Sequence, residues 1–358
     1  ENDLEDAEYV CRKLDIPFKI VDFSRQYWNK VFSQFVLEYQ QGLTPNPDIL
    51  CNKFIKFPLL LDHCIANFDH IDYIATGHYS RLEYDNKIKK FRLLKGIDEL
   101  KDQSFFLAQL EPSLLPRILF PVGQMFKSEV RKIAHDLGLD RVHRKKSSVG
   151  ICFIGKRKFS DFIDEYIVQE PGTIVDLETS EIMGQHCGIH HFTIGQKIAI
   201  NEIKNVKKKA YFVARKDFDK KIVYVVPGTD HPALYFDQFE IEKPHWLCEN
   251  KELVADDVIL NQDYEFKYQN KHYQSKIIYL RKKFLIESNQ TKYFVKTLNH
   301  FRAVPKGQYA VFYNGQECIG SAKIINTPLS LYDKKYSGKI INSDKLLNKN
   351  YVSNKMNL

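Results

Sequence analysis

The stretch Asp72–Arg81, "DYIATGHYSR", indicates the fold class of the first part of the chain. Its apolar run is typical of a short buried strand and ends at Gly77-His78. A glycine directly after such a strand lets a nucleotide approach the backbone, and a structural turn is the alternative interpretation. A strand-like run, Phe18–Phe23, precedes it. Helical patterns surround it near 27–40, 53–67, 103–109 and 127–137. This alternation predicts a parallel α/β sheet that binds ligands at the carboxyl ends of its strands.

The composition is that of folded domains with a mildly basic surface. A chain of 358 residues is expected to form two or three domains, and its 44% hydrophobic and 13% aromatic residues suit domains with cores. No run of eighteen apolar residues occurs, so no membrane-spanning helix is predicted. The net charge of +8 suits an anionic partner such as nucleic acid, and it equally suits a lysine-rich, solubilised surface.

The rest of the chain divides by pattern. We predict a first domain over 1–158 and a central domain over 159–232, with one helix near 159–167 and short strands that include "HHFTIG". Residues 233–326 are almost all β pattern with turn signals, which predicts a small barrel. The segment 327–358 is rich in Lys, Asn and Ser, and we expect a flexible tail there.

The seven cysteines are widely spaced and include no CxxC pair. A zinc ribbon and a disulfide-dense secreted scaffold are therefore not predicted, and a reducing compartment is favoured. In "TPNPDILCNK", 44–53, Cys51 follows a Pro-Asn-Pro turn and lies at an expected helix start. There the macrodipole, with Lys53 and Lys56, would favour a thiolate nucleophile. A small buried cysteine is the alternative interpretation.

Cys152 lies in "GICFIG", 150–155, between the basic runs 144–146 and 156–158. The pattern allows a buried strand between two solvated loops, or a reactive thiol beside a polyanion. Similarly, Asp102 in "LKDQSFFL" either caps a helix or contacts a polar ligand.

Several long motifs occur in a fixed order: "TPNPDILCNKFIKF", "DYIATGHYSR", "LLKGIDELKDQSFFL", "FPVGQMFKSEVRKIAHDLGL", "GICFIGKRKF", "FTIGQK" and "RAVPKGQYAVFYNGQECIG". From about residue 5 to about 325 the chain resembles the tRNA-specific 2-thiouridylase family. "TDHPALY", 229–235, is similar to the mitochondrial branch. The resemblance implies a PP-loop ATP-pyrophosphatase domain (adenine nucleotide alpha hydrolase-like, Rossmann-like), a small mixed central domain and a C-terminal β-barrel.

The resemblance also implies the chemistry. These enzymes use ATP to adenylate the C2 oxygen of the wobble uridine, and a persulfide sulfur then replaces it. By motif, Cys51 matches the nucleophile and Cys152 the persulfide carrier, which implies a transient disulfide between them. Asp48 matches an acid/base or orienting group. Mg²⁺ is expected with ATP, and no tightly bound metal is expected.

Further positions match the family by motif. Asn46, Pro47 and Asp48 match the segment that contacts the target base, and Gly77 matches the nucleotide-binding glycine. The implied tRNA contacts are His78, Lys101, Asp102, Gln103, Lys267, Tyr268 and Gln308. The implied partners are tRNA species that accept Lys, Glu and Gln, and a cysteine desulfurase or relay protein as sulfur donor. The branch implies a mitochondrial location, or the cytoplasm for a bacterial protein.

The chain departs from the family in two places. The family's Gly-rich "SGGVDSS" loop does not occur, and we expect the chain to begin downstream of it and to lack part of the ATP site. A Lys/Asn-rich segment, 201–209, stands where the family has glycines. The alternative hypothesis is a non-catalytic tRNA-binding protein on the same scaffold. A different ATP-dependent ligase is excluded by the cysteine motifs and the basic barrel.

Overall fold

Two parallel strands, β1 (Ile74–Ala75) and β4 (Ile118–Leu119), form the sheet predicted from "DYIATGHYSR". The computed structural model describes residues 2–145, 151, 153–154, 157–198, 210–247, 257–258, 264–268, 275–285, 290–327 and 329–336. Cys152 and the 201–209 segment lie outside these residues. Phe18–Phe23 is not a strand, because it pairs with no other described segment.

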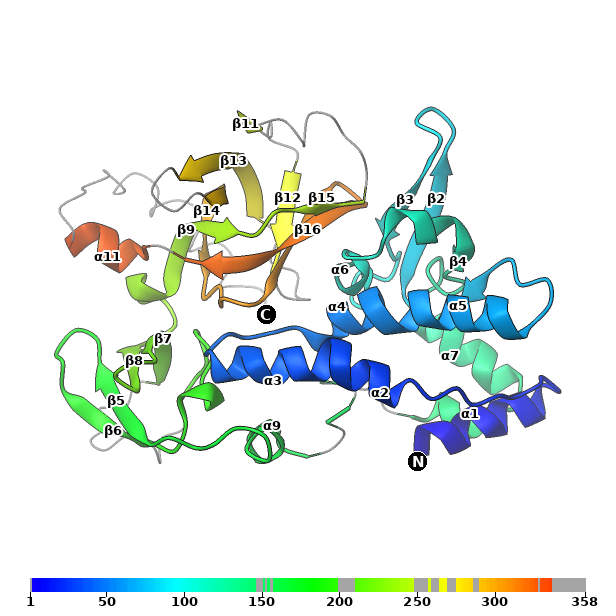
Figure 1. Cartoon of the computed structure of the whole chain (residues 1–358), viewed down its shortest axis with the longest axis horizontal. Helices are drawn as coiled ribbons and strands as arrows, with labels where there is room; N and C mark the ends of the chain where they lie inside the picture. Colours follow the sequence, from blue (N-terminus) through cyan, green and yellow to red (C-terminus); the bar gives the residue numbers. More distant parts are fainter. Residues whose placement is uncertain are drawn as a thin grey trace.

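Helices make up most of the first domain. Two long helical segments run through the middle of the molecule (Figure 1). The first joins α2 (Ser24–Tyr27), η1 (Trp28–Phe32) and α3 (Ser33–Gln40); the second joins α4 (Pro47–Cys51), η2 (Asn52–Lys56) and α5 (Pro58–Asn67). The other helices are α1 (Asn2–Lys13), α6 (Ser104–Leu107), η3 (Pro112–Arg117), α7 (Lys127–Asp136) and α8 (Asp140–His143).

The hairpin of β2 (Ser80–Asp85) and β3 (Lys90–Lys95) belongs to the first domain in sequence but pairs with the barrel. Its strand β3 joins β16 (Glu317–Asn326) through Leu94 opposite Glu317 and Leu93 opposite Cys318. Arg92 reinforces this junction, since its Nη2 lies 2.7 Å from a carboxylate oxygen of Glu317. The two domains are therefore joined by a continuous β-sheet.

The central domain begins with α9 (Phe159–Ile163) and contains a sheet in the order β6-β5-β8-β7. These strands are β5 (Gly172–Asp176), β6 (Ile182–His186), β7 (Tyr211–Asp217) and β8 (Ile222–Pro227). The prediction of a strand at "HHFTIG" is wrong. Ile189–His191 forms the 3₁₀ helix η4, and the following residues form a loop, because the side chains of both histidines turn toward Asp164.

The third domain is a closed antiparallel barrel, as the sequence pattern predicts. Strand β16 pairs with both β9 and β15, and this double pairing closes the sheet. Besides η6 (Pro232–Leu234), it contains β9 (Tyr235–Ile241), β10 (His245–Trp246), β11 (Asp257–Val258), β12 (Tyr264–Lys267), β13 (Ser275–Leu285), β14 (Gln290–Arg302) and β15 (Tyr309–Asn314).

The segment expected to be a flexible tail begins instead with a packed helix, α11 (Leu331–Tyr336). Ser330 and Asp333 cap it reciprocally: the Ser330 amide donates to the Asp333 carboxylate, and the Asp333 amide donates to Ser330 Oγ. Arg215 and Lys334 add ion pairs to Asp333 and Asp237. These contacts order the part of the tail that the structure describes.

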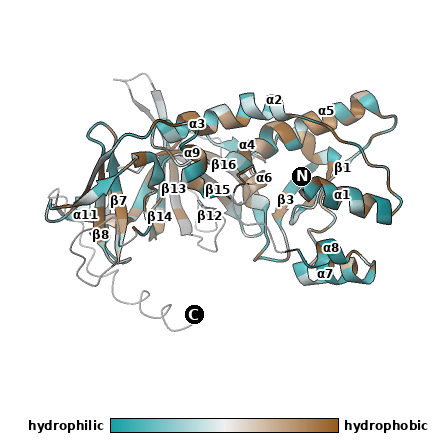
Figure 2. Ribbon diagram, turned by 90° about the horizontal axis from the view of Figure 1, so that it is seen from below, coloured by the Kyte–Doolittle hydropathy of each residue, from teal (hydrophilic) through white to brown (hydrophobic). Residues whose placement is uncertain are grey.

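Buried side chains link the domains. One core cluster holds Ile49 and Cys51 of the second helical segment together with Tyr313 and Cys318 of the barrel. Figure 2 shows hydrophobic residues along the central helices and strands, whereas α1, α7 and α8 are largely hydrophilic. Among the described residues, no helix is long and apolar enough to cross a membrane.

Candidate active site

The helix that carries Cys51 starts at Pro47. Asn46 precedes it with an extended backbone, and its Oδ1 accepts a hydrogen bond from the Ile49 amide at 3.3 Å. Asparagine at the N-cap and proline at the first helical position are both strong start signals. Cys51 is therefore the fifth helical residue, and the prediction that it lies at the helix start is wrong. The macrodipole acts mainly within the first turn, so it favours a Cys51 thiolate less than the sequence suggested.

A barrel loop holds the turn before this helix. Asn46 Nδ2 donates to Gln308 Oε1 at 3.4 Å, which brings together two predicted base-contacting and tRNA-contacting residues. The Thr44 amide donates to the Lys306 carbonyl at 2.8 Å. Gly307 has a φ of +94°, and a Cβ there would lie 2.9 Å from both Leu43 Cβ and the Thr44 nitrogen. Only glycine therefore allows this close approach.

Asp48 and His78 share one electrostatic environment around Lys56. Burial raises the pKa of the Asp48 carboxyl, and the charge of Lys56 partly opposes this. Burial lowers the pKa of His78 to about 4, and Lys56 acts in the same direction. Near neutral pH His78 is therefore an uncharged imidazole, and Asp48 takes up a proton more readily than an exposed carboxylate. Such a carboxyl suits acid/base or orienting work on a pyrimidine.

The backbone after β1 is open at Gly77. A Cβ at Gly77 would meet no atom within 4 Å, and the residue does not have a positive φ. The described fold therefore shows neither a steric nor a backbone-conformation reason for a glycine here. The next residue is held in place: His78 Nδ1 lies 2.8 Å from Thr76 Oγ1, and its ring packs against both Phe57 and Phe120, which also contact each other.

The predicted tRNA-contacting stretch 101–103 is attached to the same loop. Gln103 Oε1 accepts a hydrogen bond from the Tyr79 amide at 3.0 Å, and the Gln103 amide donates to the Tyr79 carbonyl at 2.9 Å. These two hydrogen bonds link Gln103 to Tyr79, the residue that follows His78. Lys101 is partly exposed and faces a cavity, so it can meet a solvent-side ligand.

Asp102, Lys267 and Tyr268 point into the protein. Asp102 is 3% exposed and accepts hydrogen bonds from the amides of Gly96 and Ser104, as the capping interpretation predicts. Lys267 is 8% exposed, and its Nζ lies 3.5 Å from Asp102 Oδ2. Tyr268 packs in the barrel core against Phe266 and Phe301. These three side chains are buried, whereas Gly77 is exposed and Lys101 is partly exposed.

A polar chain that the sequence did not reveal ties the cysteine helix to the barrel. Lys53 Nζ donates to Gln109 Oε1 at 2.9 Å, and Gln109 Nε2 donates to Ser321 Oγ at 2.8 Å. Ser321 Oγ donates in turn to the Ala108 carbonyl at 3.0 Å. Gln109 and Ser321 are buried, so the chain holds Lys53 in a defined position. Gln109 is the last residue of the helical pattern 103–109, and nothing else in the sequence singles it out.

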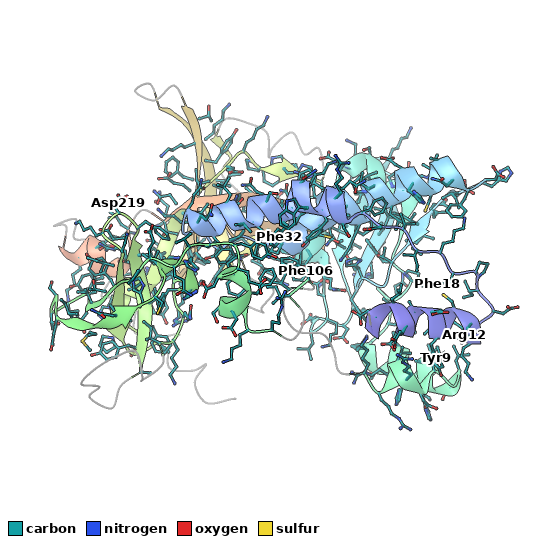
Figure 3. The ribbon with its side chains drawn as sticks, turned by 60° about the horizontal axis from the view of Figure 1, so that its bottom comes forward. Tyr9, Arg12, Phe18, Phe32, Phe106 and Asp219 are labelled. Carbon is teal, nitrogen blue, oxygen red and sulfur yellow. The ribbon has the colours of Figure 1, made fainter. Side chains whose placement is uncertain are left out.

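The described residues on either side of Cys152 pack on the first helical segment. The Ile154 amide donates to the Ile151 carbonyl at 3.2 Å, and the Phe153 ring packs on Tyr27 and Phe32. Phe32 belongs to the first helical segment (Figure 3). Tyr27 packs against both the cluster that contains Cys51 and the cluster that contains Phe153's neighbours. Tyr27 therefore contacts both of these core clusters.

The structure also contains a basic cavity of about 580 Å³ that no sequence motif indicates. It is lined by Lys101, Lys127, Ser128, Arg131, Lys132, His135 and His143. Burial lowers the pKa of Lys127, and the charges of Arg131 and Lys101 lower it further. The cations are close enough to repel one another, which is typical of a site for a polyanion. On its other side, α7–α8 packs against α1, where Tyr9 donates to the Gly138 carbonyl (Figure 3).

Three family models match consecutive parts of the chain. They are described as a tRNA methyl transferase HUP domain over residues 1–156, a tRNA methyl transferase PRC-barrel domain over 160–227, and an aminomethyltransferase beta-barrel domain over 236–324. The HUP and barrel descriptions agree with the α/β domain and the closed barrel that the structure shows.

Full-length relatives are similar across all three parts. The chain is 40% identical over 333 residues to the mitochondrial tRNA-specific 2-thiouridylase 1 of Drosophila melanogaster, covering 91% of this chain and 82% of that protein. It is 40% identical over 341 residues to the tRNA-specific 2-thiouridylase MnmA of Mycoplasmopsis pulmonis, covering 94% and 84%. It is 37% identical over 354 residues to the human mitochondrial tRNA-specific 2-thiouridylase 1, covering 93% and 81%.

Proposed function

The chain belongs to the tRNA-specific 2-thiouridylase family, and from that premise we propose that it transfers sulfur to C2 of the wobble uridine of tRNA, with ATP as co-substrate. The structural observation that carries the proposal is the surroundings of the Cys51 helix. Asn46 at its start donates a hydrogen bond to Gln308 from the barrel, and Lys56 influences the pKa of both Asp48 and His78 of the β1 loop. Residues from three distant parts of the chain thus meet around the helical segment that carries the buried Cys51 thiol.

The domain descriptions name a methyl transferase, whereas the relatives are named as thiouridylases. The relatives carry more weight, because each similarity covers all three domains at once. The presence of two cysteine motifs, at Cys51 and Cys152, also suits sulfur transfer, in which a thiolate attacks or releases sulfur.

The proposed reaction proceeds in balanced steps. The C2 oxygen of uridine attacks ATP, and pyrophosphate leaves. The terminal sulfur of a Cys152 persulfide attacks C2, and the C2–O bond breaks as AMP departs. The Cys51 thiolate then attacks the Cys152 sulfur, which breaks the S–S bond, leaves sulfur on C2 and forms a Cys51–Cys152 disulfide. A cellular thiol reduces this disulfide.

The other residues would prepare the base and the nucleotide. The base has to leave its stack to expose C2, and Asn46 and Asp48 would orient it. The open backbone at Gly77 would admit the adenine nucleotide. Mg²⁺ would accompany the ATP phosphates, and we assign no residue to it. The basic cavity around Lys101 would meet tRNA phosphates.

The partners and the location follow from the same premise. We propose tRNA species for Lys, Glu and Gln as substrates, and a cysteine desulfurase or its relay protein as the persulfide source. We propose a mitochondrial location, because two of the relatives above are mitochondrial proteins. The alternative function is tRNA binding without thiolation on the same scaffold.

The test is formation of 2-thiouridine in unmodified tRNA, read by retardation on a mercury gel. The assay contains ATP, Mg²⁺ and a cysteine desulfurase with cysteine as donor. It is run with this chain and with the product of the reading frame extended upstream. Cys51→Ser and Cys152→Ala are expected to reduce thiolation to the level without enzyme while tRNA binding persists. Cys64→Ala is the matched control, because Cys64 is a partly buried thiol on α5, outside the proposed reaction.

Two outcomes would contradict the proposal. Thiolation that survives Cys51→Ser would make that thiol structural. tRNA binding without thiolation in either version of the wild-type protein would support the binding-protein alternative.

A further inference from the structure

One cluster of ligating side chains in the central domain takes no part in the proposed reaction. Asp164 follows the last residue of α9, and His190 and His191 are adjacent in η4. Asp164 Oδ1 lies 2.9 Å from His190 Nε2 and 2.6 Å from His191 Nε2. The three potential ligand atoms all lie within 4.8 Å of one another.

We propose that Asp164, His190 and His191 bind one zinc(II) ion that ties α9 to the loop before the "FTIGQK" segment. One carboxylate oxygen and two imidazole nitrogens form a common donor set for this metal, at about 2.0–2.2 Å each. Tetrahedral ligands at that distance lie roughly 3.3 Å apart. The distances from Asp164 Oδ1 to Nε2 of His190 and Nε2 of His191 therefore need to lengthen by less than about 1 Å to admit the ion.

The surroundings support a built site. The second carboxylate oxygen of Asp164 accepts a hydrogen bond from Gln169 Nε2 at 2.6 Å, which orients the carboxylate as second-layer partners do around metals. A Cβ at Gly188 would lie 2.5 Å from His190 Cε1, so the glycine makes room for this ring. His190 is buried, while the side chains of Asp164 and His191 are each 20% exposed and leave an entry path.

Both imidazoles present the same ring nitrogen to the carboxylate, since Nε2 of His190 and Nε2 of His191 each face Asp164 Oδ1. Each imidazole would bind through Nε2 with its proton on Nδ1.

The position gives the ion a structural role. Phe162 and Ile163 of α9 pack with Ile154 in one core cluster. Ile154 lies two residues after Cys152 in the sequence. An ion at Asp164 would therefore steady the far end of the segment that carries Cys152. The alternative is a metal-free bridge in which both imidazoles donate to the carboxylate, and the experiment separates the two.

The test uses tag-free full-length protein stripped with a chelator. Zinc is titrated in competition with a chromogenic chelator, and cobalt(II) is then used as a spectroscopic substitute. We expect one zinc per chain and a cobalt spectrum of nitrogen and oxygen ligands without a thiolate charge-transfer band. Asp164→Asn and His191→Gln should each weaken zinc binding about 100-fold or more, and Gln169→Ala about 10-fold. His135→Gln is the matched control, because His135 faces a single exposed carboxylate, Asp140.

Thermal unfolding completes the test. Zinc should raise the thermal-unfolding midpoint of the wild type but not that of Asp164→Asn. Scans of Asp164→Asn and His191→Gln without metal show whether each variant is folded. Equal zinc affinity in wild type and both variants would overturn the proposal. A cobalt signal of thiolate type alone would also overturn it, since the metal would then lie on cysteines.

Discussion

His78 is the residue whose protonation most limits its role. Its ring packs against both Phe57 and Phe120, and its pKa is lowered to about 4, mainly by burial and further by the charge of Lys56. An uncharged imidazole cannot form an ion pair with a phosphate at neutral pH. If His78 contacts tRNA, as its motif implies, it does so as a neutral hydrogen-bonding group.

We predict that the His78 ring titrates near pH 4 in the folded protein, measured by NMR of ring-labelled histidine. Lys56→Met should raise this pKa only in part, because burial is the larger cause. Between pH 4 and the ordinary value of 6.5 the unfolded chain binds more protons at this position. The free energy of unfolding should therefore fall as the pH falls through that window, and less so in His78→Gln. Titration near 6.5 would contradict the prediction.

At the scale of elements, local signals predict local structure. The strand before Gly77 and the barrel strands follow from apolar runs and turn residues. The start of the Cys51 helix was placed too late, because Asn46 and Pro47 read as a turn although together they cap a helix. Contacts between distant segments have no such signal. Asn46 meets Gln308 across 262 residues, and Asp164 meets His190 across 26, so neither pairing can be read from periodicity.

The loop around Gly307 provides the element-scale prediction. Gly307→Ala should force this loop away from Leu43 and Thr44, because its Cβ has no room there. Gly315→Ala is the matched control: Gly315 also has a positive φ, but a Cβ there would meet nothing within 4 Å. The control should cost about 1 kcal/mol of unfolding free energy from backbone strain alone, and Gly307→Ala should cost about 2 kcal/mol or more.

Hydrogen exchange of the Thr44 amide, which donates to Lys306, separates the two variants. Exchange should accelerate in Gly307→Ala and stay unchanged in Gly315→Ala. Thiolation should also fall more in Gly307→Ala than in Gly315→Ala, because Gln308 would move away from Asn46. Equal behaviour of the two variants would show that the loop contact does not position the site.

At the scale of the whole molecule, the first domain and the barrel behave as one body. Strand β3 pairs with β16, Tyr313 and Cys318 share a core with Cys51, and Lys267 of the barrel meets Asp102 in a buried ion pair. Barrel movement would therefore disturb the thiol directly. This arrangement also changes the expected role of Lys267, which the family motif assigns to tRNA.

We predict that Lys267→Met destabilises the protein without weakening tRNA contact. Removing one partner of a buried ion pair leaves the other charge uncompensated, which costs about 3–5 kcal/mol of unfolding free energy. The double variant Lys267→Met/Asp102→Asn should lose less than the sum of the two single variants, because neither member of the ion pair then remains charged without the other. Chemical denaturation of the four proteins measures this coupling.

The matched control is Lys101→Met, which removes the same charge from the basic cavity. It should reduce the salt dependence of tRNA binding by about one phosphate contact and change stability by less than about 0.5 kcal/mol. Lys267→Met should leave that salt dependence unchanged at temperatures where it is folded. If Lys267→Met instead lowers the salt dependence and keeps full stability, Lys267 contacts the tRNA backbone, and the barrel has to turn this side chain outward to bind its substrate.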